Sequence, residues 1–119
     1  MQAELYEDAR GGSPVRDFIR DLDARAHSNK QAKLLLKQVR IGVERLEDSG
    51  LLAGMPHVEP LRDGICQLRP GAYRITLFHW HGDIYVLLHV FRKKTERTPD
   101  REIEEAKRLQ TDWIARNGP

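Results

Sequence analysis

The chain has 119 residues, 39% of them hydrophobic and 32% charged, and its formal net charge is +2. This length fits one domain, residues 1–119, and the composition excludes a disordered or fibrous protein. The apolar runs are too short to span a membrane and the N-terminus lacks the features of a signal peptide, so we expect a cytoplasmic protein without a membrane partner. The single cysteine, Cys66, cannot form an internal disulfide, which agrees with a reducing compartment.

The first half of the chain is predicted to form a strand followed by a helical hairpin. Apolar and polar residues alternate in AELYE, which favours an edge strand that ends at the GGSP turn. Ser13 and Pro14 are typical of a helix start, and apolar residues then recur with helical spacing. A second helix is predicted to be capped by Ser28 and to end at Gly50. Its apolar stripe consists of Ala32, Leu35, Leu36, Val39, Val43 and Leu46.

The second half is predicted to form three strands and a final helix. Turn-forming pairs DG, PG and GD separate the runs ICQLR, AYRITLFHW and IYVLLHVF, which gives an antiparallel three-stranded meander. The last run is apolar on both faces apart from His89, so we expect it to be the central strand, covered on both sides. Thr98 is predicted to cap the last helix, with Pro99 at its first position. The fold class is therefore α+β, with helices on one face of the sheet and cations lining an open face.

Basic residues are concentrated in the predicted meander. Residues 62–97 carry seven basic and three acidic side chains, a sum of +4, whereas residues 1–61 and 98–119 each sum to −1. The excess favours an anionic partner, with nucleic acid the first candidate, and a solvated basic rim is the alternative. The seven cations are Arg62, Arg69, Arg74, Arg92, Lys93, Lys94 and Arg97.

The register of the first hairpin decides which cations act together. A two-residue loop of Pro70 and Gly71 places Gln67, Arg69 and Arg74 on one face, whereas a three-residue loop separates the two arginines. We favour the shared face, because Cys66 and Leu68 then point together into the core. With Arg92, Lys93 and Lys94 at the end of the last strand, these arginines would form a phosphate clamp; solubilising cations are the alternative.

Histidine and tyrosine side chains are further candidates. His89 interrupts an apolar run near the cations and is either a general acid or base, or a packed, hydrogen-bonded side chain. His79 and His81 share a strand face, but no third ligand has a supporting spacing, so we predict no metal site and no cofactor. Tyr73 could stack on a base or belong to the core.

The motifs LRDGICQLRPGAYRITLF and IYVLLHVFRKKTERTPDREIEEAKR resemble the HigB-like, phage-related branch of the RelE/ParE toxin superfamily. The similarity extends upstream to SPVRDFIRDL and LEDSGLLAGMPHVEPL. It implies a RelE-like fold and a toxin of a type II toxin-antitoxin system, held in a heterocomplex by a cognate HigA-like helix-turn-helix antitoxin. It also implies an mRNA interferase that enters the ribosomal A site and inhibits translation. In that metal-free endoribonuclease reaction the ribose 2′-hydroxyl attacks the adjacent phosphate.

The resemblance also implies roles for individual residues. Arg69 and Arg74 match the hairpin arginines that bind phosphate and stabilise charge. Lys93 and Lys94 match the paired lysines of the KKT motif, and one of them is a candidate acid or base. Gln67 departs from the pattern, which has a glutamate there.

The final helix lacks the tyrosine that some relatives place beside the scissile phosphate. His89 and Tyr73 are the candidates to replace it. The residues expected to contact RNA are Arg62, Gln67, Tyr73, Arg92 and Arg97. We also expect an acidic segment of the antitoxin to cover the basic region.

Two other functions stay open at this point. One is a non-enzymatic, ParE-like gyrase inhibitor, and the other is a non-toxic phage-derived binding module. The basic hairpin favours the nuclease, because a phosphate clamp requires those cations.

Overall fold

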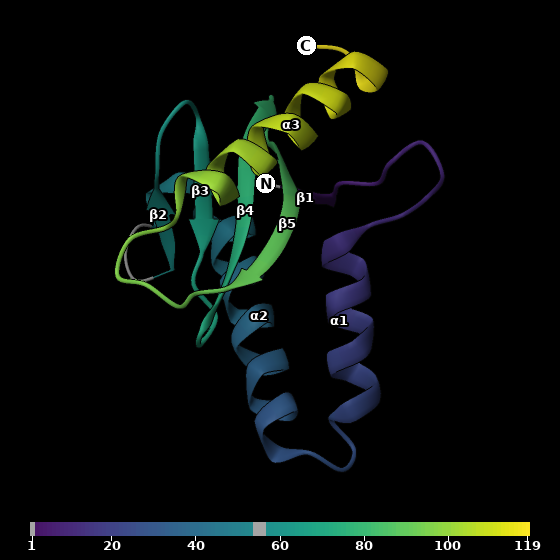
Figure 1. Cartoon of the computed structure of the whole chain (residues 1–119), viewed down its shortest axis with the longest axis vertical. Helices are drawn as coiled ribbons and strands as arrows, with labels where there is room; N and C mark the ends of the chain where they lie inside the picture. Colours follow the sequence, from purple (N-terminus) through teal and green to yellow (C-terminus); the bar gives the residue numbers. More distant parts are fainter. Residues whose placement is uncertain (1, 54–56) are drawn as a thin grey trace.

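The computed structural model describes residues 2–53 and 57–119, which form an α+β fold of three α-helices and a five-stranded sheet (Figure 1). The N-terminal strand, helical hairpin, antiparallel meander and C-terminal helix are confirmed, and their arrangement is that of a RelE-like fold. In chain order the elements are β1 (Gln2–Leu5), α1 (Pro14–Arg25), α2 (Lys30–Ser49), the 3₁₀ helix η1 (Gly50–Ala53), β2 (Val58–Pro60), β3 (Ile65–Leu68), β4 (Tyr73–His81), β5 (Ile84–Arg92) and α3 (Asp100–Asn117).

The strands lie in the order β1-β5-β4-β3-β2, with β1 parallel to β5 and the other pairs antiparallel. The prediction that the last strand is central is therefore wrong, because β1 and β2 extend the meander at both sides and leave β4 in the middle. The apolar sequence of β5 reflects coverage on both faces, which was predicted. β2 was not expected, since three residues that end in Pro60 give no alternating pattern.

Helices cover both faces of the sheet. The α1–α2 hairpin packs on one face, and α3 crosses the other (Figure 1), where its apolar stripe buries Ile103, Ala106 and Leu109. The predicted open face is therefore wrong for the part of the sheet under α3, because that stripe has to be buried. The polar side chains Glu59, Arg62, Lys93 and Arg97 line a cleft at the end of this face next to the first turn of α3.

Two of the three predicted helix caps are corrected by the structure. Ser13 caps α1 as predicted, accepting a hydrogen bond from the Arg16 amide at 3.4 Å. At α2 the cap is Asn29 and not Ser28, because Asn29 has extended backbone angles and its Oδ1 accepts from the Ala32 amide at 3.0 Å. At α3 the cap position belongs to Pro99. Thr98 instead donates its hydroxyl to the Gln67 side chain, as described below.

The charges of α2 run against its helix dipole. Helices α1 and α3 have acidic residues in their first turn and basic residues in their last turn, which the macrodipole favours. In α2 the first turn contains Lys30 and Lys33, and the last turn contains Glu47 and Asp48. This order is unfavourable for the helix itself, so helix stability does not explain it.

Candidate functional site

The two hairpin arginines lie side by side on the face that α3 partly covers. β3 and β4 pair Leu68 with Ile75, and this register places Arg69 opposite Arg74. The Tyr73 amide donates to the Pro70 carbonyl at 2.9 Å, so the two-residue loop consists of residues 71 and 72. The prediction that Arg69, Arg74 and Gln67 share one face is thereby confirmed. The observed strand pairing differs from the predicted pairing by two residues, and a shift of two residues leaves every side chain on the same face.

The predicted loop position is wrong by one residue for a conformational reason. A tight hairpin favours a positive φ at its first loop residue, and Gly71 has a φ of 55°. The pyrrolidine ring holds proline near −65°, so Pro70 cannot take that position. It precedes the loop instead.

A row of polar side chains crosses four strands beside the arginines. In the row, Gln67 donates its Nε2 to Glu59 Oε1 at 2.6 Å and accepts from the Thr98 hydroxyl at 3.0 Å. Gln67 is fully buried, so it cannot bind RNA directly. It fixes the Glu59 carboxylate and ties the segment 93–99, between β5 and α3, to the sheet.

The same row continues on β4 and β5 with a histidine that the sequence had singled out. Thr76 Oγ1 lies 2.6 Å from His89 Nδ1, and His89 Nε2 lies 3.4 Å from the Glu102 carboxylate of α3. The register shift of β5 beside Thr76 is a bulge, which turns both Leu88 and His89 toward α3. With 7% of its surface exposed, His89 is the packed, hydrogen-bonded histidine of the two alternatives.

His89 makes the stability of the fold pH-dependent. Burial lowers its pKa below the ordinary 6.5, while the hydrogen bond and charge of Glu102 act in the opposite direction. Between the folded-state and unfolded-state pKa values the unfolded chain binds more protons, so stability rises with pH across that window. We expect the free energy of unfolding to fall as the pH drops from 7.5 through 6.5 toward the lowered pKa, by more in the parent than in His89→Gln. Urea unfolding at several pH values measures this, and parallel pH profiles would contradict it.

The Arg74 side chain is hydrogen-bonded to the hairpin backbone and lies beside the positive charge of Arg69. Its Nη1 donates to the carbonyls of Gly71 and Tyr73 at 3.0 and 2.6 Å, and only 7% of the residue is exposed. Burial lowers its pKa, the positive charge of Arg69 lowers it further, and Glu59 raises it. Within residues 2–53 and 57–119, Arg74 Nε has no hydrogen-bond partner. Glu59 also lies against Arg69, with 3.7 Å between Oε1 and Nε.

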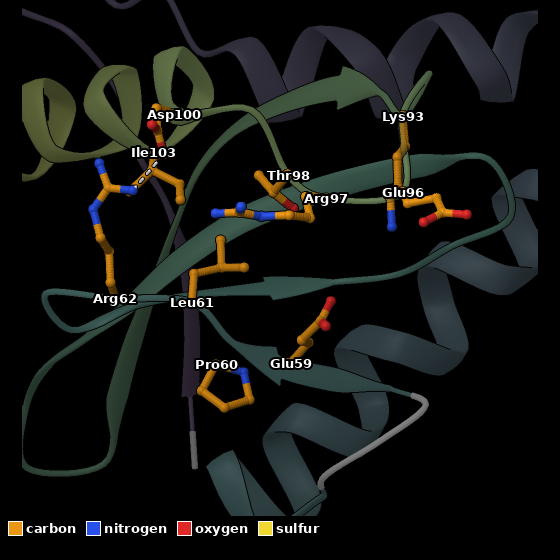
Figure 2. A pocket seen from close by; sticks show the side chains of 10 residues that line it. All are labelled: Glu59, Pro60, Leu61, Arg62, Lys93, Glu96, Arg97, Thr98, Asp100 and Ile103. Carbon is orange, nitrogen blue, oxygen red and sulfur yellow. Dashed lines mark hydrogen bonds and ion pairs between the residues drawn. The ribbon is translucent and has the colours of Figure 1, made fainter.

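A cleft of about 360 Å³ opens between β2 and the segment 93–99. Figure 2 shows Lys93 and Arg97 reaching over the strands from that segment, with the Glu59 carboxylate rising from β2 on the other side. The Lys93 amide donates to the Ala72 carbonyl at 2.8 Å, which holds Lys93 beside the hairpin turn. The lining residues are Glu59, Pro60, Leu61, Arg62, Lys93, Glu96, Arg97, Thr98, Asp100 and Ile103.

The structure does not bring all predicted site residues together. Arg62 borders the cleft but pairs with Asp100 at 2.7 Å, so its charge is largely matched by α3. Tyr73 and Arg92 pair with each other across β4 and β5 on the opposite face, where Tyr73 packs on Phe18 with 5.1 Å between the ring centres. They line a separate hollow beside α2.

Lys94 is exposed and lies outside the lining of the cleft, unlike its neighbour Lys93. Among the described residues, no group of three or more histidine, cysteine or acidic side chains could hold a metal ion. The helices in the same residues are also too short or too polar to cross a membrane.

Sequence reasoning missed Glu59 as a candidate residue of the site. Its carboxylate, on the unpredicted strand β2, accepts a hydrogen bond from Gln67, so an acidic group lies directly beside position 67. The signal that could have found it is the buried Gln67, since a buried amide requires a partner on the adjacent strand.

The helical hairpin, the antiparallel meander and the C-terminal helix give the chain a RelE-like fold. The chain belongs to the family described as phage derived protein Gp49-like (DUF891), whose profile matches residues 17–111. This is a RelE/HigB-like toxin family, and it is associated with toxin-antitoxin systems. The matched range contains every lining residue of the cleft. A comparison with curated proteins found no match.

Proposed function

We propose that the chain is a ribosome-dependent mRNA endonuclease that inhibits translation and is neutralised by a HigA-like helix-turn-helix antitoxin. The observation that carries the proposal is the opposed pair Arg69 and Arg74, beside a cleft lined by Lys93 and Glu59. Like charges on directly opposed strand positions repel each other. A phosphate group between the two guanidinium groups relieves that repulsion, and arginine forks match phosphate oxygens.

The proposed reaction is a transesterification within the RNA. The ribose 2′-oxygen forms a bond to the adjacent phosphorus and loses its proton, while the bond from phosphorus to the 5′-oxygen breaks and that oxygen gains a proton. The products are a 2′,3′-cyclic phosphate and a 5′-hydroxyl. The reaction therefore requires a proton acceptor, a proton donor and cations at the phosphorane.

Two lining residues of the cleft, together with the hairpin arginines next to it, can fill these three roles. Glu59 is the carboxylate beside the arginines and serves as proton acceptor for the 2′-hydroxyl. Arg69 and Arg74 stabilise the negative charge that develops on the phosphorane. Lys93 lines the cleft and donates the proton to the leaving 5′-oxygen.

The remaining predicted residues take supporting roles. Arg97 binds a phosphate of a flanking nucleotide across the cleft. Arg62 and Lys94 contact the RNA strand at the rim of the cleft. Gln67 and His89 position the groups around them through their buried hydrogen bonds. Tyr73 and Arg92 contact RNA only outside the cleft, because they lie on the other face.

Induction of the full chain in growing cells tests this function. We expect translation arrest, together with mRNA fragments that carry 2′,3′-cyclic phosphate and 5′-hydroxyl ends. DNA breakage with an SOS response would replace the proposal with gyrase inhibition. Normal growth with intact mRNA would replace it with a non-toxic binding module.

A further inference from the structure

A row of four cations marks the first half of α2. Lys30, Lys33, Lys37 and Arg40 follow one another at helical spacing, so they share one face with about 5–6 Å between successive Cβ atoms. The row is about 15 Å long. All four side chains are exposed, and within residues 2–53 and 57–119 none of them takes part in an ion pair or a side-chain hydrogen bond.

Helix stability does not account for these cations. Lys30 and Lys33 occupy the first turn, where the positive end of the macrodipole opposes them, and the acidic Glu47 and Asp48 occupy the last turn. By contrast, Arg25 in the last turn of α1 pairs with Asp21 at 2.9 Å, as expected for a cation that supports its own helix. These cations are therefore not used by the helix itself, and their charges are available to an external anion.

The row lies on a different surface from the candidate cleft. The first half of α2 is at the end of the helical hairpin far from α3 (Figure 1), and the hollow beside the row shares no lining residue with the cleft. This hollow has a volume of about 830 Å³. A ligand on α2 therefore leaves the cleft open to a second segment of RNA.

We propose that this row, Lys30, Lys33, Lys37 and Arg40, binds the phosphate backbone of structured RNA such as the ribosome presents. The proposal rests on the proposed function, because an enzyme that works at the ribosome needs a contact to folded RNA besides the one that holds its substrate strand. Backbone contacts need only exposed cations at regular spacing on a rigid element. An acidic protein segment is disfavoured, because protein interfaces have an apolar centre. Beside the row, among the described residues, one large apolar side chain is exposed, Leu34 at 56%, and a single leucine does not form such a centre.

The test compares two variants with the same net charge. Lys30→Gln/Lys33→Gln/Lys37→Gln removes three charges from the row, and Arg10→Gln/Arg45→Gln/Arg101→Gln removes three exposed charges elsewhere. The probe is a fluorescent 20-base-pair RNA duplex with 2′-O-methyl groups, which prevent cleavage. We expect the row variant to bind about 10-fold or more weakly at 0.1 M salt, with a salt dependence lower by about 2 in the slope of log K against log salt concentration. The scattered variant should stay near the parent.

Three further readouts keep the outcome clear. The row variant should melt at or above the parent's temperature, because its substitutions remove charges that oppose the dipole. It should also pellet less with 70S ribosomes, and Arg74→Ala should still bind the duplex, so a failure of the nuclease assignment does not affect this test. Equal loss in both charge variants, or no loss in the row variant, would overturn the proposal. Unchanged duplex binding with lost binding to a purified helix-turn-helix protein encoded beside this gene would reassign the row to a protein partner.

Discussion

Replacing Arg74 with alanine will abolish growth inhibition and lower the rate of RNA cleavage by about 100- to 1,000-fold, the effect of removing one positioned donor from a charged transition state. Arg74 lies opposite Arg69 at the hairpin, and the positive charge of Arg69 beside it favours an anion between the two side chains. Single-turnover cleavage of ribosome-bound mRNA measures the rate, and growth after induction measures toxicity.

The controls separate chemistry from folding. Because Arg74 also holds the turn through the Gly71 and Tyr73 carbonyls, thermal unfolding of the alanine variant is measured beside Arg74→Lys, which keeps the charge. Lys93→Ala and Lys94→Ala provide a matched pair of neighbours. We expect the first to lose most of its activity and the second little, since Lys93 lines the cleft and Lys94 does not. Full toxicity of a folded Arg74→Ala protein would rule out the phosphate assignment.

Local signals predicted most of the elements but not how they pack. The start of α1 and the two hairpins follow from Ser13, Pro14 and the glycine turns, because those residues restrict the backbone where they stand. No local signal tells which face of the sheet α3 covers, since its stripe fits either face. Thr98 illustrates the limit. Its position in the sequence suits a helix cap, but its hydroxyl donates a hydrogen bond to the buried Gln67, thirty-one residues away in the chain.

The candidate site was predicted where one hairpin supplies it and missed where strands from different segments meet. Arg69 and Arg74 share a face for either position of a two-residue loop, so an error of one residue in the loop did not matter. Glu59 joins them only through the β2–β3 pairing. The α2 row was not predicted, because the charges of residues 1–61 were added along the chain and gave −1. That sum does not show that four cations lie together on one face of a helix.

Changing Glu59 to glutamine is expected to lower the cleavage rate by about 100- to 10,000-fold, the range for removal of a general base. The variant should unfold near the parent's temperature, because glutamine retains a side-chain oxygen that can accept the Gln67 hydrogen bond. A change in rate without a change in stability would separate proton transfer from packing. Single-turnover cleavage and thermal unfolding of the same preparation measure both quantities. A fully active Glu59→Gln protein would exclude Glu59 as the proton acceptor.

The reciprocal change, Gln67→Glu, tests whether the two positions act as a pair. It removes the donor that contacts Glu59 at 2.6 Å and buries a second carboxylate against the first, which should destabilise the fold by about 3–5 kcal/mol. In the double variant Glu59→Gln/Gln67→Glu, the amide at position 59 donates a hydrogen bond to the carboxylate at position 67, so most of the lost stability should return. Activity should not return, because the carboxylate is then buried at position 67, away from the cleft. An active double variant would show that the carboxylate works from either strand and that the cleft lining does not define the proton acceptor.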